Sequence, residues 1–254
     1  MTTHLKPFIY AWQFLTAVPL SRTLHHPAPD VLAGSMLWYP LVGILLGGVV
    51  ALTDVVLVRW LPREVVAALL IFLLVAMTRG LHQDGLADTL DGLAGGRTVT
   101  DRLVIMRDPR LGAIGATGLF LSLIIRYGAL VSLPDALRIP VLVCMPAIGR
   151  WGMVISAYGA PYARAEGGLA SSFLTHLSGR HVFGASAVIV CLMLWCFGTV
   201  PALTAVLIGA VFSRLATMLC CHLFGGMTGD TLGATNELVE VSFLVLMPLI
   251  MSLP

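Results

Sequence analysis

The stretch GSMLWYPLVGILLGGVVALTDVVLV, residues 34–58, is apolar over almost its whole length. An apolar run of about 18 or more residues with few charges is typical of a transmembrane helix. Trp38 and Tyr39 stand near its start, and these two residue types are enriched where a helix enters the membrane interface. The stretch therefore predicts a membrane-spanning helix.

The rest of the chain repeats this pattern. Of its 254 residues, 58% are hydrophobic and 11% are charged, whereas a soluble domain carries about 25% charged residues. The apolar runs do not alternate as strands of a membrane barrel do, and an open sheet would leave unpaired edges in lipid. We expect an all-α, polytopic membrane protein of about seven transmembrane helices, folded as one integral-membrane catalytic domain over residues 1–254. The six further spans are expected at 64–81, 111–133, 139–158, 182–199, 202–224 and 238–253.

The loops between these spans alternate sides of the membrane. One side receives the N-terminus and the polar segments 82–110, 159–181 and 225–237. Nine Lys and Arg residues fall on that side, counting Arg79 at the adjoining end of the second span, and three fall on the other. Because positive residues mark the cytoplasmic side, we expect a cytoplasmic N-terminus. Residues 1–20 lack the pattern of a cleavable signal and predict an interfacial amphipathic helix that ends near Pro19.

Two further properties narrow the class of protein. The formal net charge of +2 is too small to indicate a nucleic-acid partner. All five cysteines lie inside apolar runs without the spacing of a zinc or redox pair, so we interpret them as packing residues.

The segment GLHQDGLADTLDGLAGG, residues 80–96, places three acids beside a membrane span. Asp84, Asp88 and Asp91 have the spacing i, i+4, i+7, which puts them on one face of a helix. Like charges on one face repel, and a divalent cation such as Mg²⁺ would compensate them. The alternative is a solvated helix end. Gly85 and Gly92 cost about 1 kcal/mol each in a helix, which favours close approach of the backbone to another group, such as a phosphate.

Basic residues follow these acids. Four arginines have the chemistry to bind phosphate: Arg97, Arg102, Arg107 and Arg110. The excess of positive charge that marks the cytoplasmic side explains each of them equally well. Asp108 is a candidate fourth metal ligand or, alternatively, an ion-pair partner of Arg107 or Arg110.

A second acidic stretch is GGMTGDTLGATNELVE, residues 225–240. Asp230 and Glu237 lie on one helical face, with small residues between them that leave a groove. The alternative is a helix start that Thr228 or Asp230 caps. Glu240 is expected to point toward the lipid headgroups.

Four other residues are candidates. His82 is either a base or substrate ligand or a structural hydrogen-bonding group. Arg150 and Arg214 lie within spans, where a charge is costly, so we expect both to face a polar cavity. Arg126 is expected nearer the far side, with its side chain reaching the interface.

Five blocks of the chain together resemble the cobalamin synthase family, also called adenosylcobinamide-GDP ribazoletransferase. They are FLTAVPL (14–20), YPLVGILLG (39–47), GLHQDGLADTLDGLAGG (80–96), IMRDPRLGAIGA (105–116) and GGMTGDTLGATNELVE (225–240). The blocks run in order over nearly the whole chain. Arg79 stands where the family often has glycine, and Gln83 where an apolar residue is usual.

The resemblance implies the last assembly step of the cobalamin nucleotide loop. Adenosylcobinamide-GDP would donate its cobinamide phosphate to the ribose 3′ hydroxyl of α-ribazole or its 5′-phosphate, with GMP leaving and Mg²⁺ required. It also implies the bacterial cytoplasmic (inner) membrane, with the active site facing the cytoplasm. Homo-oligomers are common among such enzymes. The sequence shows no interface, so it leaves the oligomeric state open.

The residues and the resemblance together assign roles. The expected catalytic residues are Asp84, Asp88 and Asp91, with Asp88 or Asp91 also acting as the base. The expected metal ligands are Asp84, Asp88, Asp91 and Asp108. The expected substrate-binding residues are His82, Gly85, Gly92, Arg97, Arg102, Arg107, Thr228, Asp230 and Glu237.

Two other functions remain open at this point. A CDP-alcohol-type lipid phosphotransferase would use similar acids and metal, but its second pair of aspartates is not reproduced here. An ion-coupled transporter would place its charges near the membrane midplane, often in paired repeats, whereas the acids here cluster at span ends.

Overall fold

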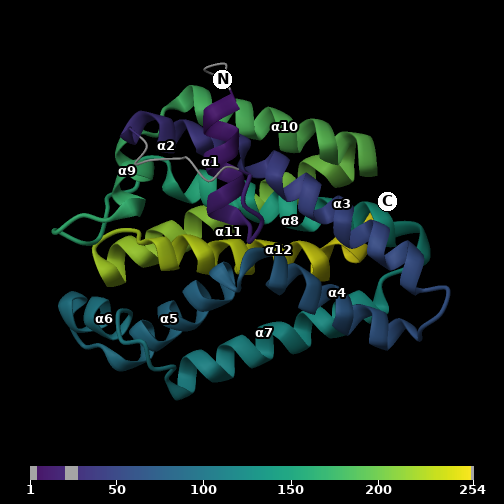
Figure 1. Cartoon of the computed structure of the whole chain (residues 1–254), viewed down its shortest axis with the longest axis horizontal. Helices are drawn as coiled ribbons and strands as arrows, with labels where there is room; N and C mark the ends of the chain where they lie inside the picture. The colour runs from purple at the N-terminus through teal and green to yellow at the C-terminus, as the bar shows by residue number, and fades with distance from the viewer. Residues whose placement is uncertain (1–4, 21–27, 253–254) are drawn as a thin grey trace.

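The computed structural model describes residues 5–20 and 28–252, and within them the chain is helical, with a single isolated β-bridge between Tyr162 and Met227. Figure 1 shows the helices in chain order. They are α1 (Leu5–Leu15), α2 (Pro29–Ser35), the 3₁₀ helix η1 (Met36–Trp38), α3 (Tyr39–Leu57), α4 (Arg63–Thr78), α5 (Leu81–Gly95), α6 (Val99–Ile105), α7 (Ala113–Ser132), α8 (Asp135–Ala157), α9 (Leu169–His176), α10 (Gly179–Phe197), α11 (Thr199–Phe224) and α12 (Gly229–Met251). The predicted all-α class is confirmed.

Six of these units are long and apolar enough to cross a membrane: residues 29–57 as one unit, α7, α8, α10, α11 and α12. Helix α4 has 16 residues, or about 24 Å, which is less than the roughly 30 Å of a bilayer core. Together with α5, from which it is bent by 89°, it makes a seventh candidate span. The expected number of about seven spans agrees with this range.

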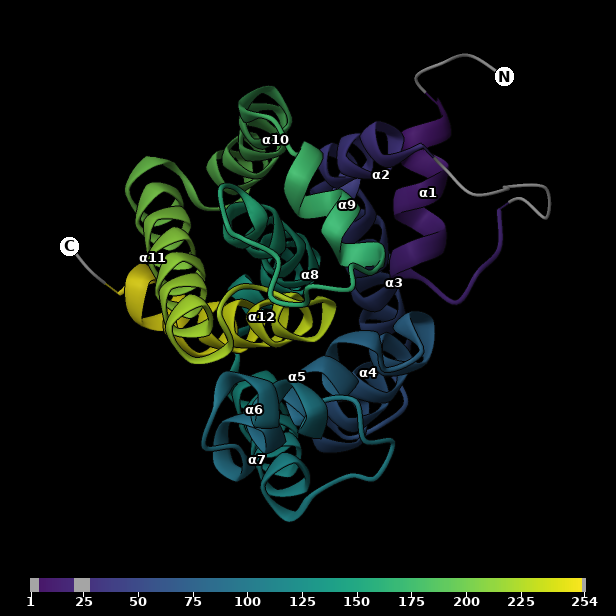
Figure 2. The same ribbon diagram turned by 90° about the vertical axis from the view of Figure 1, so that its left-hand side faces the viewer.

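Helix α8 forms the centre of the bundle. In its most apolar window 78% of the residues are buried, against 17% in α7 and 28% in α11. Figure 2 shows α8 enclosed by α3, α10, α11 and α12, seen from one end. The outer helices therefore offer their apolar faces to lipid, whereas α8 is covered by protein.

Close contact between α3 and α8 depends on two glycines of α3. A Cβ at Gly43 would stand 2.5 Å from the backbone oxygen of Pro146, and one at Gly47 would stand 2.8 Å from that of Leu142. Small residues at such crossings let two helix backbones approach in a membrane, where packing replaces the hydrophobic effect as the driving force.

A buried ion pair also joins these helices. The Arg138 side chain donates through Nε and Nη2 to the Asp54 carboxylate, with N–O distances of 2.6–3.0 Å, and both residues are buried. Hydropathy alone gave no sign that these two residues meet.

The break between α4 and α5 has a local cause. Arg79 and Gly80 adopt left-handed backbone conformations, with φ of 55° and 67°, and their N–H groups donate to carbonyls of the last turn of α4. Arg79 is the one non-glycine residue with positive φ among those described. It stands at a C-cap position that favours glycine, and the turn redirects the chain into α5.

Several boundaries differ from the expected ones. The second span ends at Thr78 instead of residue 81, and the predicted helix that carries the three aspartates is α5, which α6 follows within the polar segment 82–110. The last span begins at Gly229, nine residues before the expected 238, and its expected end at 253 lies outside the described residues. The helix starts early because Thr228 forms a capping box there. Hydropathy missed this start because its first turns carry polar residues, which are buried against protein.

We expect Gly47→Ala to lower the thermal unfolding midpoint in detergent, because the added methyl group would meet the backbone of α8. Overpacking of this kind costs about 1–3 kcal/mol. Gly48→Ala is the matched control, since nothing lies within 4 Å of its added carbon. Equal midpoints for the two variants would contradict the tight α3–α8 crossing.

Candidate active site

The three long polar segments meet at one end of the bundle. Figures 1 and 2 show α5 and α6, the connection through α9, and the start of α12 gathered there, away from the α3–α4 and α7–α8 connections. The prediction that these segments share one face is confirmed. That this face is cytoplasmic stays a prediction.

Helices α5 and α12 cross in close contact within this end. A Cβ at Gly85 would stand 2.6 Å from the backbone oxygen of Asp230, and one at Gly233 would stand 3.4 Å from the Cα of His82. Gly85 was expected to let a phosphate approach the backbone. In the structure it instead lets α5 pack closely on α12. Gly92 likewise faces the side chain of Met106 and the backbone of Arg102 on α6.

The acidic face of α5 forms as predicted. Asp84 is exposed and Asp88 is half-buried one turn later. The Asp88 carboxylate lies within electrostatic range of Asp84, Asp91 and Asp230. The α5–α12 crossing therefore gathers four carboxylates, which require a compensating positive charge.

Asp91 is the least free of these acids. Its carboxylate accepts the backbone N–H of Gly112 and of Gly115, each at 2.8 Å. Both donors belong to the start of α7, where a negative charge stabilises the helix dipole. A side chain at either glycine would collide with this carboxylate, so Asp91 joins α5 to α7.

Asp230 faces the opposite side of the cluster. It accepts a hydrogen bond from Arg164 Nη2 at 3.1 Å and one from the Thr228 hydroxyl at 3.3 Å. Thr228 is the N-cap of α12, as one of the two alternatives for this stretch predicted. Arg164 was not among the predicted site residues, because it stands in an irregular segment without helical spacing.

Two of the three predicted phosphate-binding arginines have protein partners. Arg102 donates to the backbone oxygens of Gly96 at 3.1 Å and Leu223 at 2.8 Å, so it joins α6 to α11. Arg107 forms an ion pair with Glu166. Arg97 is exposed.

Asp108 pairs with Arg110, as the second alternative for this residue predicted. Arg110 donates to both carboxylate oxygens, at 2.6–3.2 Å, and this interaction lowers the pKa of Asp108 to about 2. Asp108 and Asp91 line one cavity of about 520 Å³. A second cavity of about 550 Å³ is lined by Asp84 and Arg79, and Leu111 borders both.

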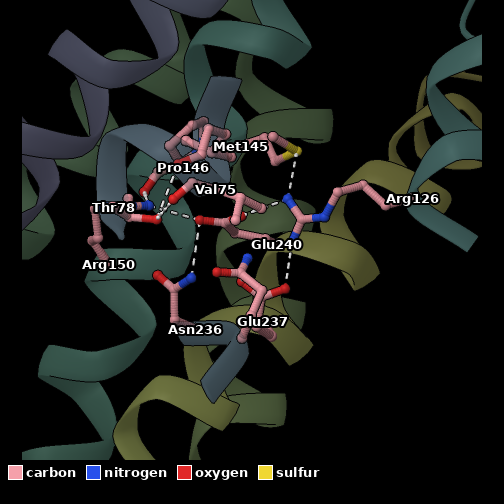
Figure 3. A network of polar contacts seen from close by, with 11 residues as sticks. Val75, Thr78, Arg126, Met145, Pro146, Arg150, Asn236, Glu237 and Glu240 are labelled. Atoms are coloured by element: carbon pink, nitrogen blue, oxygen red, sulfur yellow. Dashed lines mark hydrogen bonds and ion pairs between the residues drawn. The ribbon is translucent and has the colours of Figure 1, made fainter. Parts of the chain in front are cut away.

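Below the open acids lies a buried charged network, drawn in Figure 3. Arg126 of α7 pairs with Glu237 at 2.8 Å and with Glu240 at 2.7 Å, and Arg150 of α8 pairs with Glu240 at 2.7 Å. All four side chains are at most 2% exposed. We call these four residues the buried charge network.

The network corrects three expectations. Arg126 does not reach the interface, and Glu240 does not point toward headgroups, since both are buried against opposite charges. Glu237 does not share an open groove with Asp230, because its carboxylate is held by Arg126 and by Gln83 at 2.9 Å. Arg150 does meet polar groups, while Arg214 is exposed and donates to the carbonyls of Ile155 and Tyr158.

His82 and Gln83 connect α5 to this network. His82 is 1% exposed, and its Nε2 has no hydrogen-bond partner among the described residues. Other buried atoms without such a partner belong to the same region: Gln83 Oε1, Arg126 Nε, Arg150 Nε and Asn236 Oδ1. Buried polar atoms of this kind commonly bind internal water.

The acids of the open site supply hard oxygen donors, which suit Mg²⁺. Among the residues that the structure describes, no three His, Cys, Asp or Glu side chains are arranged to hold a metal ion by themselves. A divalent cation at this position would therefore complete its coordination with water or with the oxygens of an anionic substrate.

Comparison with known proteins gives a consistent result over the whole chain. A family profile described as cobalamin-5-phosphate synthase matches residues 7–248. The protein named adenosylcobinamide-GDP ribazoletransferase in Syntrophobacter fumaroxidans is 41% identical over 241 residues, covering 92% of this chain and 94% of that protein. Proteins of the same name in Pseudomonas fluorescens and Clostridium botulinum are 39% and 31% identical, over 95% and 97% of this chain and 98% and 99% of theirs. No solved structure matches the chain.

We expect Glu240→Gln to destabilise the protein strongly, because it leaves Arg126 and Arg150 in the bundle with one carboxylate between them. Removing one member of a buried pair costs about 3–5 kcal/mol. Thermal unfolding in detergent measures the effect. The control is Asp135→Asn, which removes an exposed pair with Arg63 and should cost about 1 kcal/mol or less. A midpoint for Glu240→Gln no lower than that of the control would contradict the buried charge network.

Proposed function

The chain belongs to the cobalamin-5-phosphate synthase family, and we propose that it catalyses the reaction for which its curated relatives are named, adenosylcobinamide-GDP ribazole transfer. The family match over residues 7–248 and the high coverage of each relative support this assignment. The donor is adenosylcobinamide-GDP, and the acceptor is α-ribazole or its 5′-phosphate.

The reaction exchanges one phosphorus–oxygen bond for another. The ribose 3′ hydroxyl of the acceptor attacks the phosphorus that carries the cobinamide. A new phosphodiester forms, the pyrophosphate bond breaks, and GMP leaves with the bridging oxygen. The hydroxyl proton passes to a base. The protein has to bind two phosphoryl groups, orient the hydroxyl and accept this proton.

The observation that carries the proposal is the gathering of Asp84, Asp88 and Asp230 opposite Arg164 at one end of a membrane bundle. Acids alone would repel a pyrophosphate. Acids beside an arginine, with Asp84 lining one cavity and Asp91 lining the other, suit a phosphate-bearing substrate whose charge is balanced by a cation.

We assign the metal site to Asp84 and Asp88. Mg²⁺ is usually held by one or two carboxylates together with water and substrate phosphates, so two acids one turn apart are sufficient. When bound, Mg²⁺ would neutralise charge on the transferred phosphoryl group and on GMP. Asp91 and Asp108 are weaker candidates for this role, because backbone N–H groups and Arg110 respectively already hold their oxygens.

We assign the base to Asp88. This role was expected for Asp88 or Asp91, and both carboxylate oxygens of Asp91 already accept backbone N–H groups, which leaves Asp88 as the acceptor of the hydroxyl proton. We further propose that the site faces the cytoplasm from a bacterial inner membrane, and the excess of Lys and Arg on the loops at this end supports that orientation.

The function is tested by GMP release from adenosylcobinamide-GDP in detergent with α-ribazole and Mg²⁺. We expect the wild-type protein to release GMP only with acceptor present, and Asp88→Asn to lower kcat by about 10²–10⁴-fold, as for loss of a general base. The control is Glu64→Gln, an exposed acid at the start of α4. Wild-type protein that folds and releases no GMP with both substrates would refute the function. A wild-type rate in Asp88→Asn would refute the role of Asp88.

Removal of divalent metal tests the metal assignment separately. We expect chelation with EDTA to abolish GMP release and added Mg²⁺ to restore it, since the gathered acids and the pyrophosphate repel each other without a cation. We also expect Asp84→Asn to raise the Mg²⁺ concentration needed for half-maximal rate. Full activity in EDTA would show that the acids act without metal.

A further inference from the structure

Arg164 is the basic side chain that the structure places against the acidic cluster. Its Nη2 lies 3.1 Å from Asp230 Oδ2, and it is also within electrostatic range of Asp88. The side chain is 16% exposed. The arginines that the sequence suggested for phosphate binding have other partners or lie exposed, so Arg164 is the guanidinium group best placed for an anion at this site.

The backbone beside Arg164 is held firmly. Met227 N donates to Pro161 O at 2.8 Å, and Ala163 N donates to Met227 O at 3.0 Å. These two bonds fasten the segment directly to the residue before the N-cap of α12. Gly226 makes the contact possible, because a Cβ there would stand 2.5 Å from Pro161 O. The start of the Arg164 side chain is therefore fixed relative to Asp230.

The far side of the same segment is tied to the turn that follows α6. Glu166 forms an ion pair with Arg107, and the chain then turns at Gly167, whose φ is 78°. The Tyr162 hydroxyl donates to Gly167 O at 3.4 Å, which closes the turn on itself. Residues 161–167 thus form a short bridge between the start of α12 and the turn after α6, with Arg164 at its middle.

The Arg164 guanidinium has more N–H donors than its ion pair with Asp230 uses. A guanidinium carries five N–H groups in a planar fork, and the ion pair with Asp230 is made through a single nitrogen. Its Nε is buried and has no hydrogen-bond partner in the described part of the chain. This group is preorganised to accept a second anion with two parallel hydrogen bonds, the geometry that phosphate oxygens favour.

We propose that Arg164 binds the pyrophosphate of the nucleotide-activated donor, with Asp230 holding the guanidinium in place. The inference rests on the proposed function and deepens it, because it names the positioning residue for the donor that sequence reasoning missed. The bridge of residues 161–167 is then a preformed part of the donor site, and the acceptor makes no use of Arg164.

The test uses steady-state kinetics of the purified full-length protein in detergent, with Arg164→Ala and Arg164→Lys. Arg180→Ala is the matched control, since Arg180 is an exposed arginine at the start of α10, outside the site. Three quantities are compared: the KM for donor, the KM for α-ribazole, and the inhibition constant for added GMP. Thermal unfolding midpoints confirm that each variant is folded.

Arg164→Ala should raise the KM for donor and the GMP inhibition constant by about 10–100-fold, the loss of a charge-assisted hydrogen-bonded pair, and leave the KM for α-ribazole unchanged. Arg164→Lys should recover part of this loss, because a lysine keeps the charge without the fork.

Donor KM and GMP inhibition equal to those of Arg180→Ala would overturn the proposal. So would an equal rise in the KM values for donor and acceptor with a lowered midpoint, which marks a purely structural role. Absence of transfer by the wild-type protein would instead refute the proposed function, so the two failures are distinguishable.

Discussion

The burial of two arginines and two glutamates in the middle of a lipid-embedded bundle is the constraint on which the arrangement of helices depends. Arg126, Arg150, Glu237 and Glu240 come from α7, α8 and α12, and each has an opposite charge within 2.8 Å. A charge without a partner at this depth costs several kcal/mol, so these helices cannot separate or slide by a turn without a large penalty. Gln83 adds α5 to the same network through Glu237.

Two polar layers with different charge balance result from this arrangement. The inner layer is neutral, with two positive and two negative groups that form ion pairs with one another. The outer layer holds Asp84, Asp88, Asp91 and Asp230 against Arg164 and is therefore acidic. Because the inner network fixes α5 and α12, the outer acids keep their spacing although they repel. The buried charges therefore hold the helices together, and the outer charges are the ones that we propose bind metal and phosphate.

The sequence predicted features that depend on local pattern. Hydropathy gave the spans, and the i, i+4, i+7 spacing gave the acidic face of α5. It failed where the outcome depends on tertiary partners. Arg126 and Glu240 looked like interfacial residues because a sequence does not show that they meet each other. Arg102 was expected to bind phosphate, because a sequence does not show that the backbone oxygen of Leu223 lies beside its guanidinium group. Arg164 has no periodic signal, since a bridge to Met227 and not a helix positions it.

The crossing of α5 on α12 at Gly85 is the central claim, because it unites the α5 acids with Asp230 and Arg164. The most direct test is the rate of GMP release by Gly85→Ala, measured well below the unfolding midpoint of the variant. The added carbon would stand 2.6 Å from Asp230 O and would displace α5 from α12. The account predicts folded protein with at least about tenfold slower transfer, since small misplacements of reacting groups are costly. Folded Gly85→Ala with the wild-type rate would contradict it.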